Sequence, residues 1–140
     1  MLALRFDPRH FEADLSDEPD AYLGLETEVI ILLCSEARVA DNEVPRGMIN
    51  RGWWANTVPL DIVLNQDGSR LWLLQAAGAL PRSVRLAEKF AERALSPLLA
   101  DKRVAGVIIV GELGEMDRIN LGVTLVLPDG FQVGPIRLTW

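Results

Sequence analysis

Apolar residues recur with the spacing of an α-helix in two parts of the chain. In residues 21–38 they fall three or four positions apart, at Leu25, Val29, Leu32 and Leu33. We interpret this segment as a helix, although the short apolar run 29–31 taken alone is equally typical of a buried strand. The second segment begins at Pro81, a residue favoured at the first position of a helix. Its apolar stripe predicts a single helix that continues to residue 98: Val84, Ala87, Phe90, Ala91, Ala94, Leu95 and Leu98.

The last third of the chain has the pattern of β-strands. Residues 104–110 form a β-branched apolar run, and residues 119–127 alternate between apolar and polar positions, as in a strand with one buried face. The sequence Pro128-Asp129-Gly130 is typical of a tight turn, because proline fixes φ and glycine tolerates positive φ. A third strand is therefore expected to return antiparallel to the second.

The phase of the apolar residues changes within this third strand. Phe131 and Val133 share one phase, Gly134-Pro135 follow, and Ile136, Leu138 and Trp140 resume in the opposite phase. Such a change predicts a β-bulge at the Gly-Pro pair. Because proline has no N–H to donate, it also confines this segment to a bulge or to the edge of a sheet. We therefore predict that residues 131–140 form an open edge strand.

The front of the chain contributes less regular structure. Leu2, Leu4 and Phe6 alternate with other residues and predict a short strand, which Asp7-Pro8 ends. An acidic turn is expected at residues 15–20. The fold class that follows is α+β: a small antiparallel sheet of three C-terminal strands, with a possible N-terminal strand, packed against two main helices.

Residues 39–69 contain many glycines, prolines and polar residues and are interpreted as a long irregular connection. Connections of this length are uncommon unless they carry function. This one contains Trp53 and Trp54, and a helical turn capped by Ser69 and containing Trp72 is expected directly after it. Indole rings anchor many protein interfaces, but a tryptophan also commonly pins a loop to its own core, so both interpretations remain open.

Composition narrows the class of protein. The chain has 140 residues, of which 49% are hydrophobic and 24% charged, typical of one soluble globular domain, residues 1–140. No apolar run approaches the roughly 20 residues of a membrane-spanning helix. The net charge of −6 disfavours nucleic-acid binding. One cysteine and one histidine provide neither a disulfide nor a zinc site, so no metal or cofactor is expected.

Two groups of charged residues are candidates for chemistry. Glu112, Glu115 and Asp117 cluster in a turn, but no nucleophile or base accompanies them, and we interpret them as a solvated acidic turn. A basic row follows one side of the second helix, at Arg82, Arg85, Lys89 and Arg93. It is interpreted as a solvated face, with an acidic protein partner or nucleic acid as the alternatives. The sequence predicts no catalytic residue and no small-molecule substrate.

Three sequence strings resemble one known family. They are Arg51-Gly52-Trp53-Trp54, the string Gly68-Ser69-Arg70-Leu71-Trp72-Leu73-Leu74, and Leu25-Glu26-Thr27-Glu28-Val29 followed by the cluster at residues 35–38. In this order, followed by a helix and a terminal β region with Pro-Asp-Gly, they resemble the baseplate wedge proteins of Mu-like phages. That family is similar to the wedge-core and sheath-initiating proteins of other contractile tails.

The resemblance implies a structural subunit of a contractile tail, assembled in the bacterial cytoplasm and located in the baseplate of the virion. Its implied partners are other wedge proteins and tail sheath subunits. Combined with the predicted edge strand, it gives a set of candidate interaction residues: Trp53, Trp54, Trp72, Phe131, Val133, Ile136, Leu138 and Trp140. Two alternatives stay open, a small peptidoglycan hydrolase acting through the acidic turn, and a soluble regulator that dimerises through its exposed strand.

Overall fold

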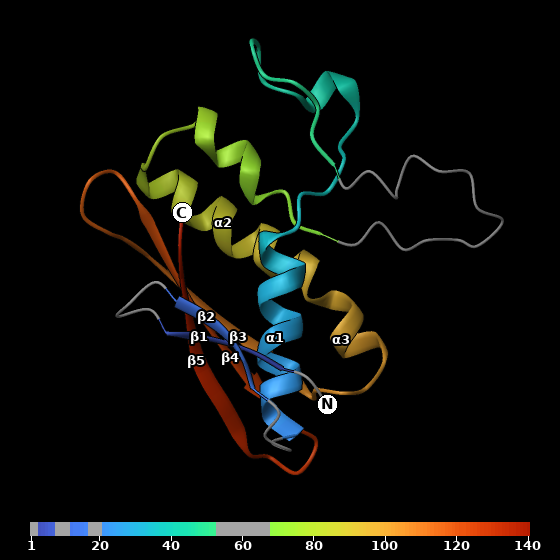
Figure 1. Cartoon of the computed structure of the whole chain (residues 1–140). Coiled ribbons are helices and arrows are strands. Elements are labelled where there is room, and N and C mark those ends of the chain that lie inside the picture. Colours follow the sequence, from blue (N-terminus) through green and yellow to red (C-terminus); the bar gives the residue numbers. More distant parts are fainter. Residues whose placement is uncertain (1–2, 8–11, 17–20, 53–67) are drawn as a thin grey trace, which may run out of the picture.

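The computed structural model describes residues 3–7, 12–16, 21–52 and 68–140 (Figure 1). The elements follow in the order β1 (Ala3–Asp7), β2 (Glu12–Ser16), α1 (Ala21–Cys34), the 3₁₀ turn η1 (Asp41–Glu43), the 3₁₀ helix η3 (Leu71–Ala76), α2 (Pro81–Ala94), α3 (Ser96–Ala100), β3 (Gly106–Leu113), β4 (Ile119–Val126) and β5 (Gln132–Thr139). The predicted α+β class is confirmed, with both main helices and all three C-terminal strands.

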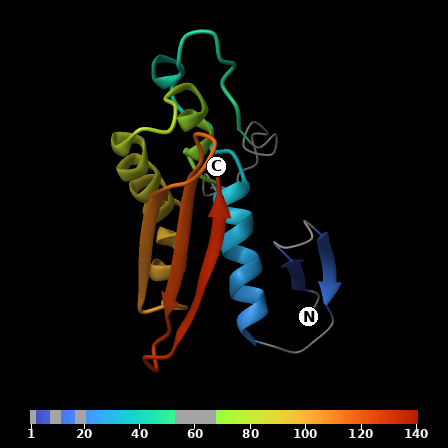
Figure 2. The ribbon, with the colours of Figure 1, turned by 90° about the vertical axis from the view of Figure 1, so that its left-hand side faces the viewer.

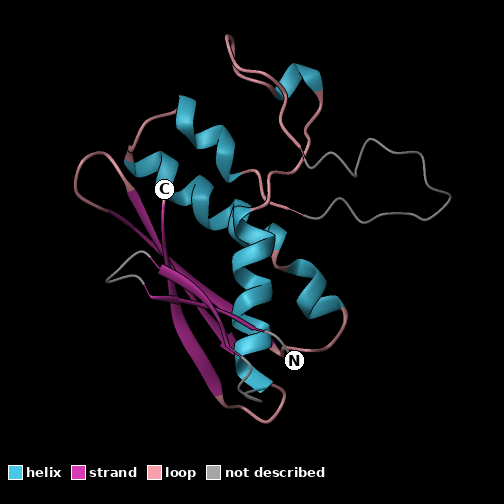
Figure 3. Ribbon diagram, viewed as in Figure 1, coloured by secondary structure: helices cyan, strands magenta, loops and turns pink. Residues whose placement is uncertain are grey.

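The three C-terminal strands form an antiparallel sheet in the order β3-β4-β5. The turn 128–130 joins β4 to β5 as predicted, and the Gly130 N–H donates to the carbonyl of Leu127 over 2.9 Å. The helices α1, α2 and α3 lie on the same side of this sheet (Figures 2 and 3). The structure is thus a helical layer packed on one face of a three-stranded sheet.

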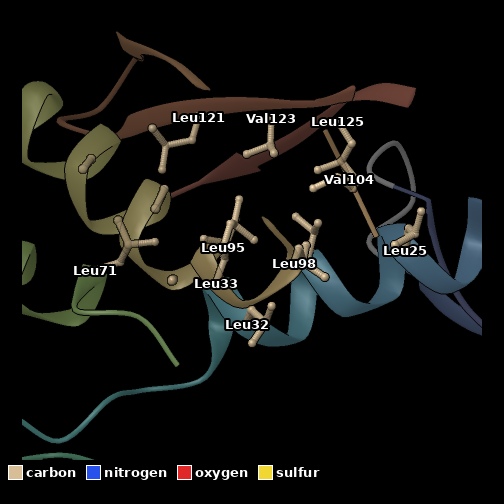
Figure 4. Close-up of a cluster of buried hydrophobic side chains, with 14 of the residues drawn as sticks. Leu25, Leu32, Leu33, Leu71, Leu95, Leu98, Val104, Leu121, Val123 and Leu125 are labelled. Carbon is tan, nitrogen blue, oxygen red and sulfur yellow. The ribbon is translucent and has the colours of Figure 1, made fainter. Parts of the chain in front are cut away.

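The core lies between the central strand and the helices. The apolar side chains of β4 on one face are almost completely buried, whereas the residues between them are half-buried. Leu121, Val123 and Leu125 point toward Leu95 and Leu98, which join the helical layer (Figure 4). Burying one such side chain contributes about 1.5–3 kcal/mol, so this alternation alone fixes which face of the sheet meets the helices.

The helix predicted from the apolar spacing of residues 21–38 is confirmed as α1, and its four predicted core residues Leu25, Val29, Leu32 and Leu33 are all buried. It ends at Cys34, however, and not at Arg38 as predicted. Residues beyond Ser35 turn away because Glu36 forms a parallel β-bridge with Ser69. Pairing with a distant segment therefore overrides the helical pattern of the last residues.

The second helix also differs from its prediction. The stripe expected to run unbroken to residue 98 divides into α2 and α3, with Leu95 as the residue between them. Pro97 is the cause, since proline lacks an N–H and clashes with the carbonyl of the preceding turn. Leu95 and Leu98 are nevertheless fully buried, so the apolar stripe keeps its direction across the break.

The N-terminal strand exists but does not join the main sheet. β1 pairs antiparallel with β2, a strand that the sequence pattern does not predict, since only its last two residues, Leu15 and Ser16, fall in the expected acidic turn and residues 12–14 have no clear pattern. The resulting hairpin contacts α1 and lies on the opposite side of α1 from β3–β5 (Figure 2). Among the described helices, none has both the length and the apolar character required to cross a membrane.

The helix α2 passes close to β3 at Gly111. A Cβ placed at this glycine would lie 2.7 Å from Cγ1 of Val84 and 3.1 Å from Cγ of Glu88. At Gly106, on the same strand, the nearest atom to an added Cβ is 3.8 Å away. These two glycines form a matched pair for testing the contact between the helix and the strand.

We predict that Gly111→Ala lowers the free energy of unfolding by about 1–3 kcal/mol, because the methyl group overpacks the contact with α2. Gly106→Ala is expected to leave this free energy unchanged or slightly raised. Urea denaturation followed by circular dichroism measures both. Equal effects of the two substitutions would show that α2 does not approach β3 at Gly111.

Candidate interaction site

The outer edge of β5 carries backbone groups that β4 does not use. Ile119 and Trp140 exchange two hydrogen bonds, with N···O distances of 2.7 and 2.8 Å. In an antiparallel pair, the residues between such hydrogen-bonded pairs direct their N–H and C=O groups away from the partner strand. The backbone groups of Arg137 and Thr139 therefore point outward. Within the described residues, no strand pairs with this side of β5.

The predicted bulge is present and fixes the register of this edge. Val123 lies opposite Ile136 and Leu125 opposite Val133, so Gly134 and Pro135 together face one residue of β4. Gly134 has φ +119°, and an added Cβ would lie 2.7 Å from the carbonyl oxygen of Val123. This position therefore requires a glycine, and the bulge lies at the Gly-Pro pair, as the sequence pattern predicts.

The side chains of β5 divide between core and surface. Val133 is buried, Ile136, Leu138 and Trp140 are half-buried against the core cluster, and Phe131 is exposed. Trp140 also lines a hollow of about 460 Å³ between η3 and the end of the strand, together with Leu74, Ala79, Ile119 and Thr139. Three of the five candidate residues thus lie in β5 and the other two directly flank it, and no described strand pairs with the outer edge of β5.

The opposite edge of the sheet is partly occupied. The hydrogen bond from the Gly114 N–H to the carbonyl of Arg118 sets the alternation of β3, so that Gly111 directs its N–H outward. This N–H donates to Oε1 of Glu88 over 2.8 Å. A side chain of α2 therefore covers the middle of the β3 edge. The sequence pattern does not reveal this role of Glu88, because it depends on how α2 crosses β3 in the folded protein.

Trp72 lies inside the molecule. Its side chain is 3% exposed, and its indole N–H donates to the carbonyl of Ala37 over 2.9 Å. The guanidinium carbon of Arg51 lies 5.9 Å from the centroid of the ring. Trp72 therefore supports the surface from within, by tying η3 to the chain that follows α1, and does not itself lie on that surface. Trp53 and Trp54 fall outside the described residues.

The chain that follows α1 meets the segment before η3 in a short paired region, residues 35–38 and 68–72, which we call the neck. The Ser69 N–H donates to the Ser35 carbonyl over 2.8 Å, and the Ala37 N–H donates to the Ser69 carbonyl over 2.9 Å. The buried hydroxyl of Ser69 donates to the Leu33 carbonyl over 2.6 Å. The neck therefore closes the long connection at its base.

Residues 51 and 52 also reach the neck. Arg51 pairs with Glu36 over 2.8 Å, and an added Cβ at Gly52 would lie 2.8 Å from Cβ of Arg38. Residues 35–38, 51–52 and 68–72, which belong to the three strings that carry the family resemblance, therefore meet in space.

The charged groups singled out in the sequence lie on the surface. Glu112, Glu115 and Asp117 are exposed on β3 and the turn that follows it, as a solvated turn requires. Arg82, Arg85, Lys89 and Arg93 are likewise exposed along α2. Among the described side chains, no cluster of histidine, cysteine and carboxylate groups has the arrangement of a metal site.

The fold, the open edge and the neck define a small α+β protein with a sheet edge suited to pairing with another chain. Residues 25–132 match the model of the family described as Phage protein GP46. The chain is 34% identical over 109 residues to "Baseplate protein gp46" of Escherichia phage Mu, covering 76% of this chain and 72% of the relative. It is 31% identical over 107 residues to "Mu-like prophage FluMu protein gp46" of Haemophilus influenzae, covering 76% and 71%. The chain belongs to the GP46 family, which confirms the resemblance to a Mu-like baseplate family.

Two buried serines allow the neck to be tested against an internal control. The Ser69 hydroxyl has its partner, whereas the Ser83 hydroxyl in α2 is fully buried and has no hydrogen-bond partner among the residues that the structure describes. We predict that Ser69→Ala lowers the free energy of unfolding by about 1–3 kcal/mol, because the Leu33 carbonyl loses its donor. Ser83→Ala is expected to be neutral or stabilising, since it removes an unsatisfied group. Thermal and urea denaturation of both variants decide this, and a Ser69→Ala variant as stable as the native chain would contradict the role given to the neck.

Proposed function

We propose that this protein is a structural subunit of a phage tail baseplate and is located in the tail of the virion. Membership of the GP46 family supports this role, and the relative from phage Mu is itself named a baseplate protein. Its partners are other proteins of the baseplate. The proposal assigns no catalytic step to the chain, because Glu112, Glu115 and Asp117 are exposed on β3 and the turn that follows it, as solvated carboxylates are.

Within the baseplate, we propose that the subunit belongs to the wedge and that its β5 edge accepts a strand from a neighbouring subunit. The observation that carries this proposal is the row of outward N–H and C=O groups at Arg137 and Thr139. Free groups of this kind are a template for β-augmentation, in which the main chain supplies the hydrogen bonds and alternate side chains supply specificity. If the donor is a sheath subunit, the edge serves as the template for the first ring of the sheath.

The β5 edge suits this role better than the β3 edge does. A strand that approaches β3 meets the Glu88 carboxylate on the Gly111 N–H and the side of α2 beside it. On β5, the described residues place no side chain on the outward backbone groups of Arg137 or Thr139. Strand addition is consequently expected at one edge of the sheet only.

Replacing a single outward donor tests strand addition without disturbing the fold. Arg137→Pro removes the outward N–H and places a ring in the path of an added strand, while the bonds from β5 to β4 are kept. We predict roughly tenfold or more fewer sheathed tails among particles assembled with this variant, counted by electron microscopy. Arg137→Ala is the matched control, since it removes the side chain and keeps the N–H.

The stage at which assembly of the Arg137→Pro particles fails distinguishes sheath templating from strand docking within the wedge. Complete baseplates without sheaths in Arg137→Pro particles would support sheath templating, and failure of the baseplate itself would support strand docking within the wedge. Normal baseplates and sheaths, with circular dichroism confirming that the variant is folded, would overturn the docking role of β5. An equal defect in Arg137→Ala would assign the effect to the side chain and contradict pairing through the backbone.

A further inference from the structure

A pocket of about 430 Å³ lies where the neck meets the helices α2 and α3, away from the β5 edge. Three of its lining residues are arginines from three separate segments: Arg38 after α1, Arg70 before η3 and Arg93 in the last turn of α2. Among the described residues of the lining, Asp101 is the one that is acidic. Ligand pockets in proteins commonly measure roughly 300–1,000 Å³, so this pocket is large enough to hold a ligand.

The positive charge of this pocket contrasts with the charge of the protein. The chain carries a net charge of −6, yet the pocket combines three guanidinium groups with one carboxylate. Like charges raise one another's electrostatic energy, so a cluster of arginines is stabilised when an anion lies among them. Neither Arg38 nor Arg93 forms an ion pair or hydrogen bond through its side chain with any residue that the structure describes.

A carboxylate of the protein itself already lies beside this cluster. Oε1 of Glu43, in η1, pairs with Nη1 of Arg70 over 2.8 Å. The backbone N–H of Ala40, followed by the Arg70 side chain and the more distant charge of Arg93, holds the pKa of the Glu43 carboxyl below its ordinary value. One of the three arginines of the pocket, Arg70, thus already pairs with a carboxylate, that of Glu43.

The rest of the lining favours one kind of anion. Apolar side chains surround the arginines, namely Ala37, Phe90, Ala94, Pro97 and Ala100. A glutamate side chain presents methylene groups to such a wall and its carboxylate to the guanidinium forks. An inorganic anion would leave this wall uncovered, and Asp101 disfavours the higher charge of phosphate.

We propose that this arginine pocket binds an acidic segment of a partner protein, with one of the segment's carboxylates between Arg93 and Arg38 and a second competing with Glu43 for Arg70. The contact is distinct from strand addition at β5 and does not depend on it. It gives the subunit a second attachment point, formed by the helical layer and the neck.

A short fluorescent peptide of alternating glutamate and alanine is the probe, measured against the full chain by fluorescence anisotropy at low salt. A peptide with glutamine in place of glutamate is the matched ligand control. We expect Arg93→Gln and Arg70→Gln to weaken binding of the acidic peptide by about fivefold or more, as the loss of a charge-assisted contact would. Arg82→Gln, which removes an exposed arginine of α2 outside the pocket, is expected to change the affinity by less than about twofold.

Glu43→Gln tests the competition directly and in the opposite direction. Removing the internal carboxylate is expected to strengthen peptide binding by about threefold or more, because Arg70 no longer has to exchange partners. This gain cannot arise from a loss of folding, and melting temperatures verify that the arginine variants remain folded.

Several results would overturn the proposal. They are equal binding of the glutamine peptide, an equal loss in Arg82→Gln, and unchanged or weaker binding in Glu43→Gln. Displacement of the peptide by inorganic phosphate at the same concentration would assign the pocket to a phosphate-type anion and equally contradict an acidic protein segment.

Discussion

The closure of the long connection at the neck is the constraint on which the rest of the structure depends. A β-bridge between Glu36 and Ser69, with the Ser69 hydroxyl on the Leu33 carbonyl and the Trp72 indole on the Ala37 carbonyl, joins segments more than 30 positions apart. Closing a long loop costs conformational entropy, but this cost grows only slowly with the length of the loop. A few buried hydrogen bonds at the base of the loop are therefore sufficient to keep it closed. With the neck closed, α1 and η3 take fixed positions, and the helical layer is able to cover the sheet.

The sheet then presents two edges that differ because of this layer. The helix α2 approaches β3 so closely that a Cβ at position 111 would lie 2.7 Å from Cγ1 of Val84, and the Glu88 carboxylate reaches the strand there. Natural proteins commonly protect sheet edges from unwanted pairing by covering or charging them. Within the described residues, the β3 edge is thus partly covered and the β5 edge is not, so the strand addition proposed above has one edge of the sheet available to it.

The sequence predicted those elements that depend on local pattern. The alternation in β4, the turn at 128–130, the bulge at Gly134 and the stripe of α2 all follow from spacing and backbone chemistry, and each is confirmed. The break at Pro97 was also present in the sequence, but the continuous apolar stripe concealed it. By contrast, the end of α1 at Cys34, the hairpin of β1 with β2 and the bond from Gly111 to Glu88 arise from contacts between distant segments, which periodicity does not encode.

The candidate site shows the same division. The position of residues 131–140 at an edge followed from Pro135 and the change of phase, whereas the interior position of Trp72 depended on an acceptor 35 residues away. The arginine pocket could not be found from sequence alone, because Arg38, Arg70 and Arg93 belong to separate elements that only the neck brings together.

The bulge determines what the open edge offers to a partner. A shift of one residue between β4 and β5 would exchange the core and solvent faces of the whole strand and would also exchange its outward and inward backbone groups. Gly134 prevents this shift, because no side chain fits between it and the Val123 carbonyl and because its positive φ excludes most other residues. Arg137 and Thr139 therefore keep their outward backbone groups, while Ile136, Leu138 and Trp140 keep their contacts with the core. A strand that adds to this edge meets a surface whose register is already set before the partner arrives, which is the property that a template requires.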